Sequence, residues 1–166
     1  MRHHGRPFRG AAAKGAEVGL LELAGLSSAC LAVLHLLIVL VGAPAYRYFG
    51  AGERMARLSE QGSLAPALAT LGLALVFAAW AAYAFSGAGL LRRLPFLKTG
   101  LLVIGLVYTM RGVLLGPQVV WFLSGHRAAV PPRQLLFSGA ALLIGIAYLG
   151  GVLASGGPAG PAGDRR

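Results

Sequence analysis

The chain has 166 residues, of which 57% are hydrophobic and 12% are charged, and its mean hydropathy is +0.71. A soluble domain carries about 25% charged residues, so this composition excludes a water-soluble globule, and it excludes intrinsic disorder for most of the chain. The net charge of +10 does not indicate nucleic-acid binding, because the basic residues lie mostly in tails and loops between long apolar runs. That distribution is typical of membrane proteins, in which basic residues set orientation and meet anionic lipid headgroups.

Four apolar stretches follow one another, each close to the ~20 residues that a membrane-spanning helix needs. They cover residues 18–42, 64–85, 97–116 and 134–153. Ala and Leu dominate these stretches, and no alternation with a period of two persists, which excludes strands and a closed barrel. The sequence therefore predicts an all-α polytopic membrane protein, a bundle of four transmembrane helices within residues 18–154.

The ends of the chain differ from the spans in composition. Residues 1–17 are rich in Arg, His and Gly and are expected to form a cytoplasmic tail. Residues 155–166 hold two collagen-like triplets, too few for a triple helix, and are expected to be a disordered cytoplasmic tail. Ala43-Pro44-Ala45 resembles a signal-peptide cleavage site, but the preceding apolar run exceeds the usual length of about 7–15 residues. We therefore expect the first run to remain as a span.

Orientation follows from the positions of Lys and Arg. Nine of them lie in the N-terminal tail, the second loop and the C-terminal tail, against five in the first and third loops. The positive-inside rule then places both termini in the cytoplasm. Arg outnumbers Lys thirteen to two, and Ala, Gly and Leu dominate, which indicates a GC-rich bacterial genome and a bacterial inner membrane.

Three segments carry a resemblance to other proteins. They are YRYFGAGERMAR (46–57) with the following Gly62-Ser63, Pro66-Ala67 and Thr70, SGAG (86–89), and YTMRG (108–112). Together they resemble an uncharacterised family of small four-span proteobacterial inner-membrane proteins, over roughly residues 20–115. The resemblance implies location and architecture, and it implies no activity.

The first loop has the pattern of a short interfacial helix. Glu53 and Arg57 are four residues apart in the favourable order, and Glu60 is three beyond Arg57. Met55 and Leu58 would face the membrane, as in an amphipathic helix that lies on its surface. The alternative is a solvated charged loop.

Ionisable groups within spans are costly and therefore suggest function. His35 and Arg111 are each expected at roughly 8–11 Å from the outer end of their spans, from a rise of 1.5 Å per residue. Thr70 and Ser138 fall near the same depth, so the four residues form a predicted intramembrane polar layer that can bind an anionic headgroup or a small anion, or relay protons. The alternatives are an Arg111 that snorkels to the interface, a His35 bonded to a neighbouring helix, and hydroxyls bonded to their own backbone.

A second anion site is predicted at the cytoplasmic side, where Arg92 and Arg93 follow Gly87-Ala88-Gly89 and can meet lipid headgroups. Glu22 is a possible partner of these arginines. No paired catalytic carboxylates and no Ser/His/Asp set stand out, so no catalytic residue is assigned. No Cys/His spacing supports a metal site, and His35 is the one intramembrane histidine, so no metal or cofactor is expected.

The fourth span carries a face of small residues, with Ala141 four residues before Gly145 and Ala147 four before Gly151. Such a face allows close helix contact, either inside one chain or in a dimer.

These patterns favour a small, non-enzymatic inner-membrane protein that binds or senses lipid or supports a partner complex. The alternative is transport of a small solute or ion by an oligomer, and a membrane enzyme ranks third. The expected partners are membrane lipids, and a second copy or a membrane partner protein remains open, whereas nucleic acid is not expected.

Overall fold

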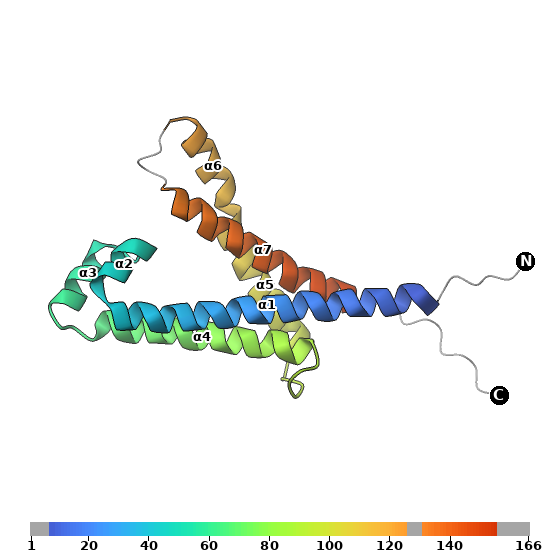
Figure 1. Cartoon of the computed structure of the whole chain (residues 1–166). Coiled ribbons are helices and arrows are strands. Elements are labelled where there is room, and N and C mark those ends of the chain that lie inside the picture. Colours follow the sequence, from blue (N-terminus) through green and yellow to red (C-terminus); the bar gives the residue numbers. More distant parts are fainter. Residues whose placement is uncertain (1–6, 126–130, 156–166) are drawn as a thin grey trace, which may run out of the picture. The chain divides into compact units, whose positions relative to one another are not determined.

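We analysed a computed structural model of the chain, which describes residues 7–125 and 131–155 (Figure 1). Within that part of the chain the secondary structure is entirely helical, which confirms the predicted all-α class. The helices are α1 (Pro7–Val41), α2 (Ala43–Phe49), α3 (Glu53–Glu60), α4 (Ala65–Gly87), α5 (Leu97–Val113), α6 (Leu115–Leu123) and α7 (Pro132–Ser155).

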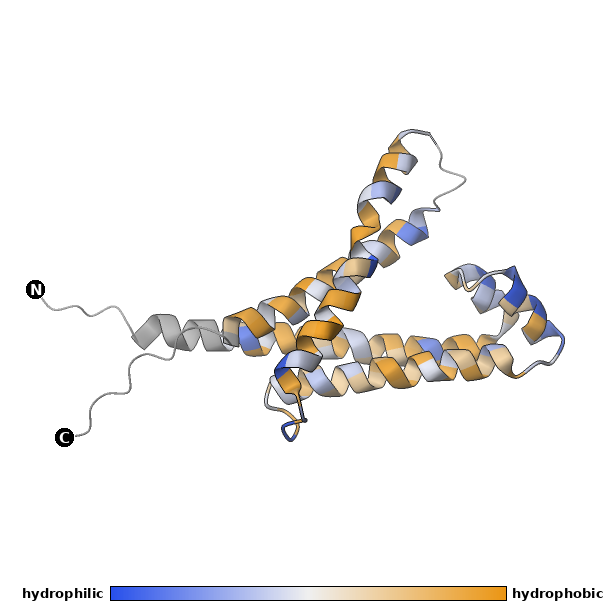
Figure 2. Ribbon diagram, turned by 180° about the vertical axis from the view of Figure 1, so that it is seen from behind, coloured by the Kyte–Doolittle hydropathy of each residue, from blue (hydrophilic) through white to orange (hydrophobic). Residues whose placement is uncertain are grey.

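Four helical segments are long and apolar enough to cross a membrane: Gly15–Val41, Ala65–Gly87, Leu97–Leu123 and Pro132–Ala154. The protein is thus a multi-pass membrane protein. Figure 2 shows apolar residues along these segments, whereas hydrophilic residues gather at α2 and α3 and in the loop after α4.

The third helical segment is longer than the sequence analysis predicted. The predicted span stops at Gly116, before Pro117. In the structure the helix is interrupted at Leu114 and continues as α6 to Leu123. Pro117 is the third residue of α6, so it stands in the first turn, where a missing N–H costs nothing. The Gly-Pro pair therefore permits a new helix here and does not end the span.

The chain divides into two compact units, whose boundaries fall inside α1 and α4. The central unit comprises residues 25–83, and the terminal unit comprises residues 1–24 and 84–166. In the central unit, a core of buried residues forms where α1 meets α2 and α3: Ile38, Ala43, Ala45, Tyr46 and Ala56. Met55 packs against this core, so α3 contacts the core of its own unit. The predicted helix is present, but Met55 faces protein where we expected it to face the membrane.

In the terminal unit, α5 and α7 pack closely because glycines line their contact. A Cβ on Gly112 would lie 2.5 Å from the Cα of Leu142, and one on Gly145 would meet Thr109 and the Gly105 carbonyl. The rings of Tyr108 and Tyr148 stack at the same contact, with centroids 5.8 Å apart. The small-residue face of α7 is therefore used inside the chain: Ala141, Gly145, Ala147 and Gly151 are all buried.

Candidate functional site

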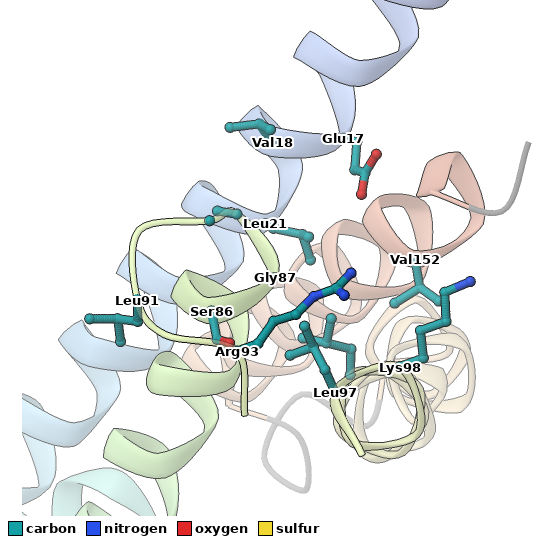
Figure 3. Close-up of a pocket in the computed structure, with 13 residues that line it drawn as sticks. Glu17, Val18, Leu21, Ser86, Gly87, Leu91, Arg93, Leu97, Lys98 and Val152 are labelled. Carbon is teal, nitrogen blue, oxygen red and sulfur yellow. The ribbon is translucent and has the colours of Figure 1, made fainter. Parts of the chain in front are cut away.

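A pocket of about 500 Å³ lies in the terminal unit, where the loop after α4 meets the first turns of α5, the stretch Glu17–Leu21 of α1 and the last turn of α7 (Figure 3). Part of its wall is apolar and is formed by Leu21, Leu97, Leu101 and Val152, among others. Glu17, Arg93 and Lys98 line it as well. In Figure 3 the guanidinium of Arg93 points into the pocket. We call this site the basic pocket.

The loop that carries Arg93 is held by one buried hydroxyl. Ser86 is 3% exposed, and its Oγ donates to the Arg92 carbonyl at 2.9 Å and accepts from the Leu94 N–H at 3.0 Å. These bonds fix the backbone on both sides of Arg93. The Ser86 side chain therefore helps to hold the backbone that carries Arg93.

The turn that leads into this loop requires a glycine. Gly89 has φ +82°, and the Leu90 N–H reaches back to the Phe85 carbonyl at 2.9 Å. This is the Schellman arrangement that ends many helices, and a side chain at Gly89 would be strained. The chain reverses sharply at this point and returns over the end of α4, where Ser86 can bond it.

The predicted pair Arg92–Arg93 is divided by this geometry. Arg93 lines the basic pocket, whereas Arg92 contributes its carbonyl to Ser86 and is not among the lining residues. Lys98, which the sequence analysis did not single out, takes the place of the second cation. Glu17 is the carboxylate at the pocket, while Glu22 is exposed elsewhere on α1. The sequence carries a signal for the role of Lys98, because Leu97 and Lys98 begin α5 directly after the loop that holds Arg93.

A second polar group, the Arg111 cluster, consists of Arg111, Gln118 and Ser138 in the terminal unit. Arg111 Nη1 donates to Ser138 Oγ at 2.8 Å, and Ser138 Oγ donates to Gln118 Oε1 at 2.8 Å. Ser138 is fully buried, Gln118 is half-buried and Arg111 is exposed on the chain. The structure thus brings together two of the four residues of the predicted layer.

Gln118 was absent from the prediction, although its position carries a signal. Arg111 and Gln118 are seven residues apart, which is about two helical turns, so they share a face across the break at Leu114. Because the predicted span ended at Gly116, Gln118 was counted as part of a loop.

The other two residues of the predicted layer lie in the central unit with partners of their own. His35 Nδ1 donates to the Leu31 carbonyl at 2.7 Å, and its ring lies 4.9 Å from that of Phe77. Thr70 Oγ1 donates to the Pro66 carbonyl at 2.8 Å and lies 3.5 Å from the hydroxyl of Tyr46. A single layer that holds all four residues stays a prediction.

The central unit also holds a cluster of charges that sequence spacing showed only in part. Arg47 binds two carboxylates bidentately, Glu53 at 3.0 and 3.1 Å and Glu60 at 2.7 and 3.1 Å. Arg57 donates to Glu53 at 3.2 Å, the expected pair, whereas Glu60 bonds Arg47. Hydrogen bonds from Arg47 and Arg57 lower the pKa of Glu53 to about 2, and the bonds from Arg47 lower the pKa of Glu60.

Within residues 7–125 and 131–155, no group of three or more His, Cys, Asp or Glu side chains is placed to hold a metal ion. No protein-family model, curated protein or solved structure matches the chain. The resemblance to the four-span proteobacterial family stays a prediction.

Proposed function

We propose that this protein is a non-enzymatic membrane protein that binds anionic lipid in the basic pocket. The observation that carries the proposal is the pairing of two cations, Arg93 and Lys98, with an apolar wall in one pocket of about 500 Å³. A soluble anion would need the cations alone, whereas an anionic amphiphile uses both surfaces. Membrane lipids are the amphiphiles available to a multi-pass protein.

Each lining group has a role in this proposal. The planar guanidinium of Arg93 suits bidentate binding of a phosphate, and Lys98 supplies a compact second charge. Leu97 and Leu101 offer apolar surface to the first part of an acyl chain. Glu17 accepts hydrogen bonds, so a headgroup with hydroxyls or an ammonium beside its phosphate fits best.

The proposal extends to location. The nine-to-five distribution of Lys and Arg supports a bacterial inner membrane with both termini in the cytoplasm. The basic pocket then faces the cytoplasmic leaflet, whose anionic lipids attract basic segments. Support of a membrane partner protein is compatible with this role, since bound lipid can bridge two proteins.

The test is lipid binding by the full chain in neutral detergent, measured by native mass spectrometry with phosphatidylglycerol. Arg93→Gln/Lys98→Gln should weaken binding at this site by about tenfold or more, because charge-assisted hydrogen bonds to phosphate are lost. The matched control, Arg54→Gln/Arg92→Gln, removes the same two charges from exposed positions outside the pocket. An equal loss in both variants would show that net charge alone attracts the lipid and would refute the proposal.

A further inference from the structure

The hydrogen bonds of the Arg111 cluster run in one direction. A guanidinium can only donate, so Ser138 accepts from Arg111 and must use its single proton on the Gln118 carbonyl oxygen. That leaves the Gln118 amide with two N–H groups and Arg111 with four further N–H groups. The groups left to bind a ligand are therefore mainly donors, against one remaining lone pair each on Gln118 Oε1 and Ser138 Oγ. Such a set is complementary to an acceptor, and best to an anion.

The position of the cluster favours an anionic partner. Arg111 lies inside the candidate span Leu97–Leu123, twelve residues before its end, about 18 Å along the helix. A charged side chain at that depth is costly unless it is paired. Among the described residues no carboxylate forms an ion pair with Arg111. Glu53 and Glu60 bind Arg47, Glu17 lines the basic pocket, and Glu22 is exposed on α1.

Along the sequence, no carboxylate lies close to Arg111. The five carboxylates of the sequence are Glu17, Glu22, Glu53, Glu60 and Asp164, and none lies in the stretch around Arg111 or in α7. Within residues 7–125 and 131–155, no counter-charge for Arg111 is therefore present.

We propose that Arg111 and Gln118 form an oxyanion site for a phosphate group, with Ser138 as the bridge that orients both donors. The guanidinium offers a planar fork to two oxygens, and the Gln118 amide donates to one of them or to the third. The same chemistry fits the headgroup of a lipid drawn toward the helix break and a phosphate that enters from water. This site is distinct from the basic pocket and shares no residue with it.

One substitution is expected to supply the counter-charge of Arg111 from within the chain. Gln118→Glu replaces the amide by a carboxylate beside Ser138, where it can neutralise Arg111 and repel an incoming anion. The variant should fold as well as the wild type or better, since a costly charge gains a partner, and it should lose phosphate binding. Gln61→Glu is the matched control, because it makes the same substitution at an exposed position of the central unit, outside the Arg111 cluster.

The test uses the full chain in the Arg93→Gln/Lys98→Gln background, so that the basic pocket does not contribute. Binding is measured in neutral detergent with phosphatidylglycerol, with diacylglycerol of the same acyl chains, and with inorganic phosphate. We expect phosphatidylglycerol to bind and diacylglycerol to fail, and Gln118→Glu and Arg111→Leu to weaken binding by about tenfold or more. Gln61→Glu should bind as the background chain does.

The three probes distinguish a lipid headgroup from free phosphate as the ligand. Binding of phosphatidylglycerol but not of inorganic phosphate identifies a lipid headgroup site, and binding of both identifies a site for any phosphate. Binding of neither, or equal binding by a folded Gln118→Glu chain, would overturn the proposal. A failure of the proposed lipid binding in the basic pocket is seen in a different comparison. In that case Arg93→Gln/Lys98→Gln would leave lipid binding unchanged relative to the wild-type chain.

Discussion

Two arginines of this protein show how differently a guanidinium can be satisfied. Arg47 lies outside the spans between two bidentate carboxylates, whose hydrogen bonds raise its pKa above its ordinary value. Arg111 lies inside a span, and its one partner in the described chain is the neutral hydroxyl of Ser138. The Arg47 cluster is complete within the chain, whereas the Arg111 cluster is open. This contrast supports the proposal that the first cluster has a structural role and that the second binds a ligand.

The completeness of the Arg47 cluster makes the contact of α2 with α3 sensitive to acid. The pKa of Glu53 is lowered from 4.5 to about 2, and that of Glu60 is lowered as well, so the ion pairs stabilise this region fully above pH 4.5. That stabilisation is lost as the pH falls from 4.5 toward about 2, because the carboxylates are protonated while Arg47 stays charged.

Carboxyl carbon shifts of Glu53, followed by NMR in detergent micelles, measure this titration. The midpoint should lie near 2, and the amide shifts of α3 should move with it. Arg47→Gln should move the midpoint back toward 4.5, since the first cause of the shift is its hydrogen bonds. A midpoint of 4.5 in the wild-type chain would show that the pairs do not persist in solution.

At the scale of elements, the contact between α5 and α7 depends on the absence of side chains. Gly112 and Gly145 let the backbones of the two helices approach closely, and the buried Tyr108 and Tyr148 fill the adjacent space. Van der Waals packing of this kind is the main source of helix association where lipid removes the hydrophobic driving force. The same contact sets the distance between Arg111 on α5 and Ser138 on α7.

Gly112→Ala tests that dependence. The added Cβ would lie 2.5 Å from the backbone of Leu142, which cannot rotate away, so the helices must separate. We expect a loss of stability of about 1–3 kcal/mol, the usual cost of overpacking, measured by thermal unfolding in detergent. Gly116→Ala is the control, because nothing lies within 4 Å of its added Cβ, and it should be neutral or gain up to about 1 kcal/mol from helix propensity. Equal effects would show that this contact does not limit stability.

The sequence predicted the elements better than the contacts between them. The four spans follow from apolar length alone, which is a strong signal in a chain with so few charges. The break at Leu114 was missed because Pro117 stops one helix or opens the next, and only packing decides between the two. Gln118 was lost with that boundary. His35 and Arg111 were grouped by depth alone, whereas the hydrogen bonds of each are set by the helix that it faces.

At the scale of the whole molecule, orientation is the property that most directly governs function. The basic pocket can meet cytoplasmic lipid only if the loop after α4 lies on the cytoplasmic side. That side is fixed by Lys and Arg counts in the loops and tails, which act during insertion and leave no trace in the packing of the finished helices.

Cysteine labelling checks the orientation in a chain whose exposed Cys30 is replaced by Ala. Cysteines at the exposed positions Gln61, before α4, and Leu90, after it, lie on opposite sides of the predicted membrane. Gln61→Cys should react with an impermeant maleimide in intact cells, and Leu90→Cys should react only after lysis. The reverse result would place the basic pocket outside the cytoplasm.

The share of each span that is buried has a consequence for how this sequence can change over time. In the fourth span, 39% of the most apolar stretch of 18 residues is buried, against 22% of the corresponding stretch in the second span. A position that faces acyl chains accepts almost any apolar residue, since a fluid solvent does not select for shape. We therefore expect the sequence of α4 to diverge quickly among homologues through exchanges of Leu, Ile, Val and Phe. The helix α7 should diverge slowly, and its glycines and Ser138 should outlast most of the residues around them.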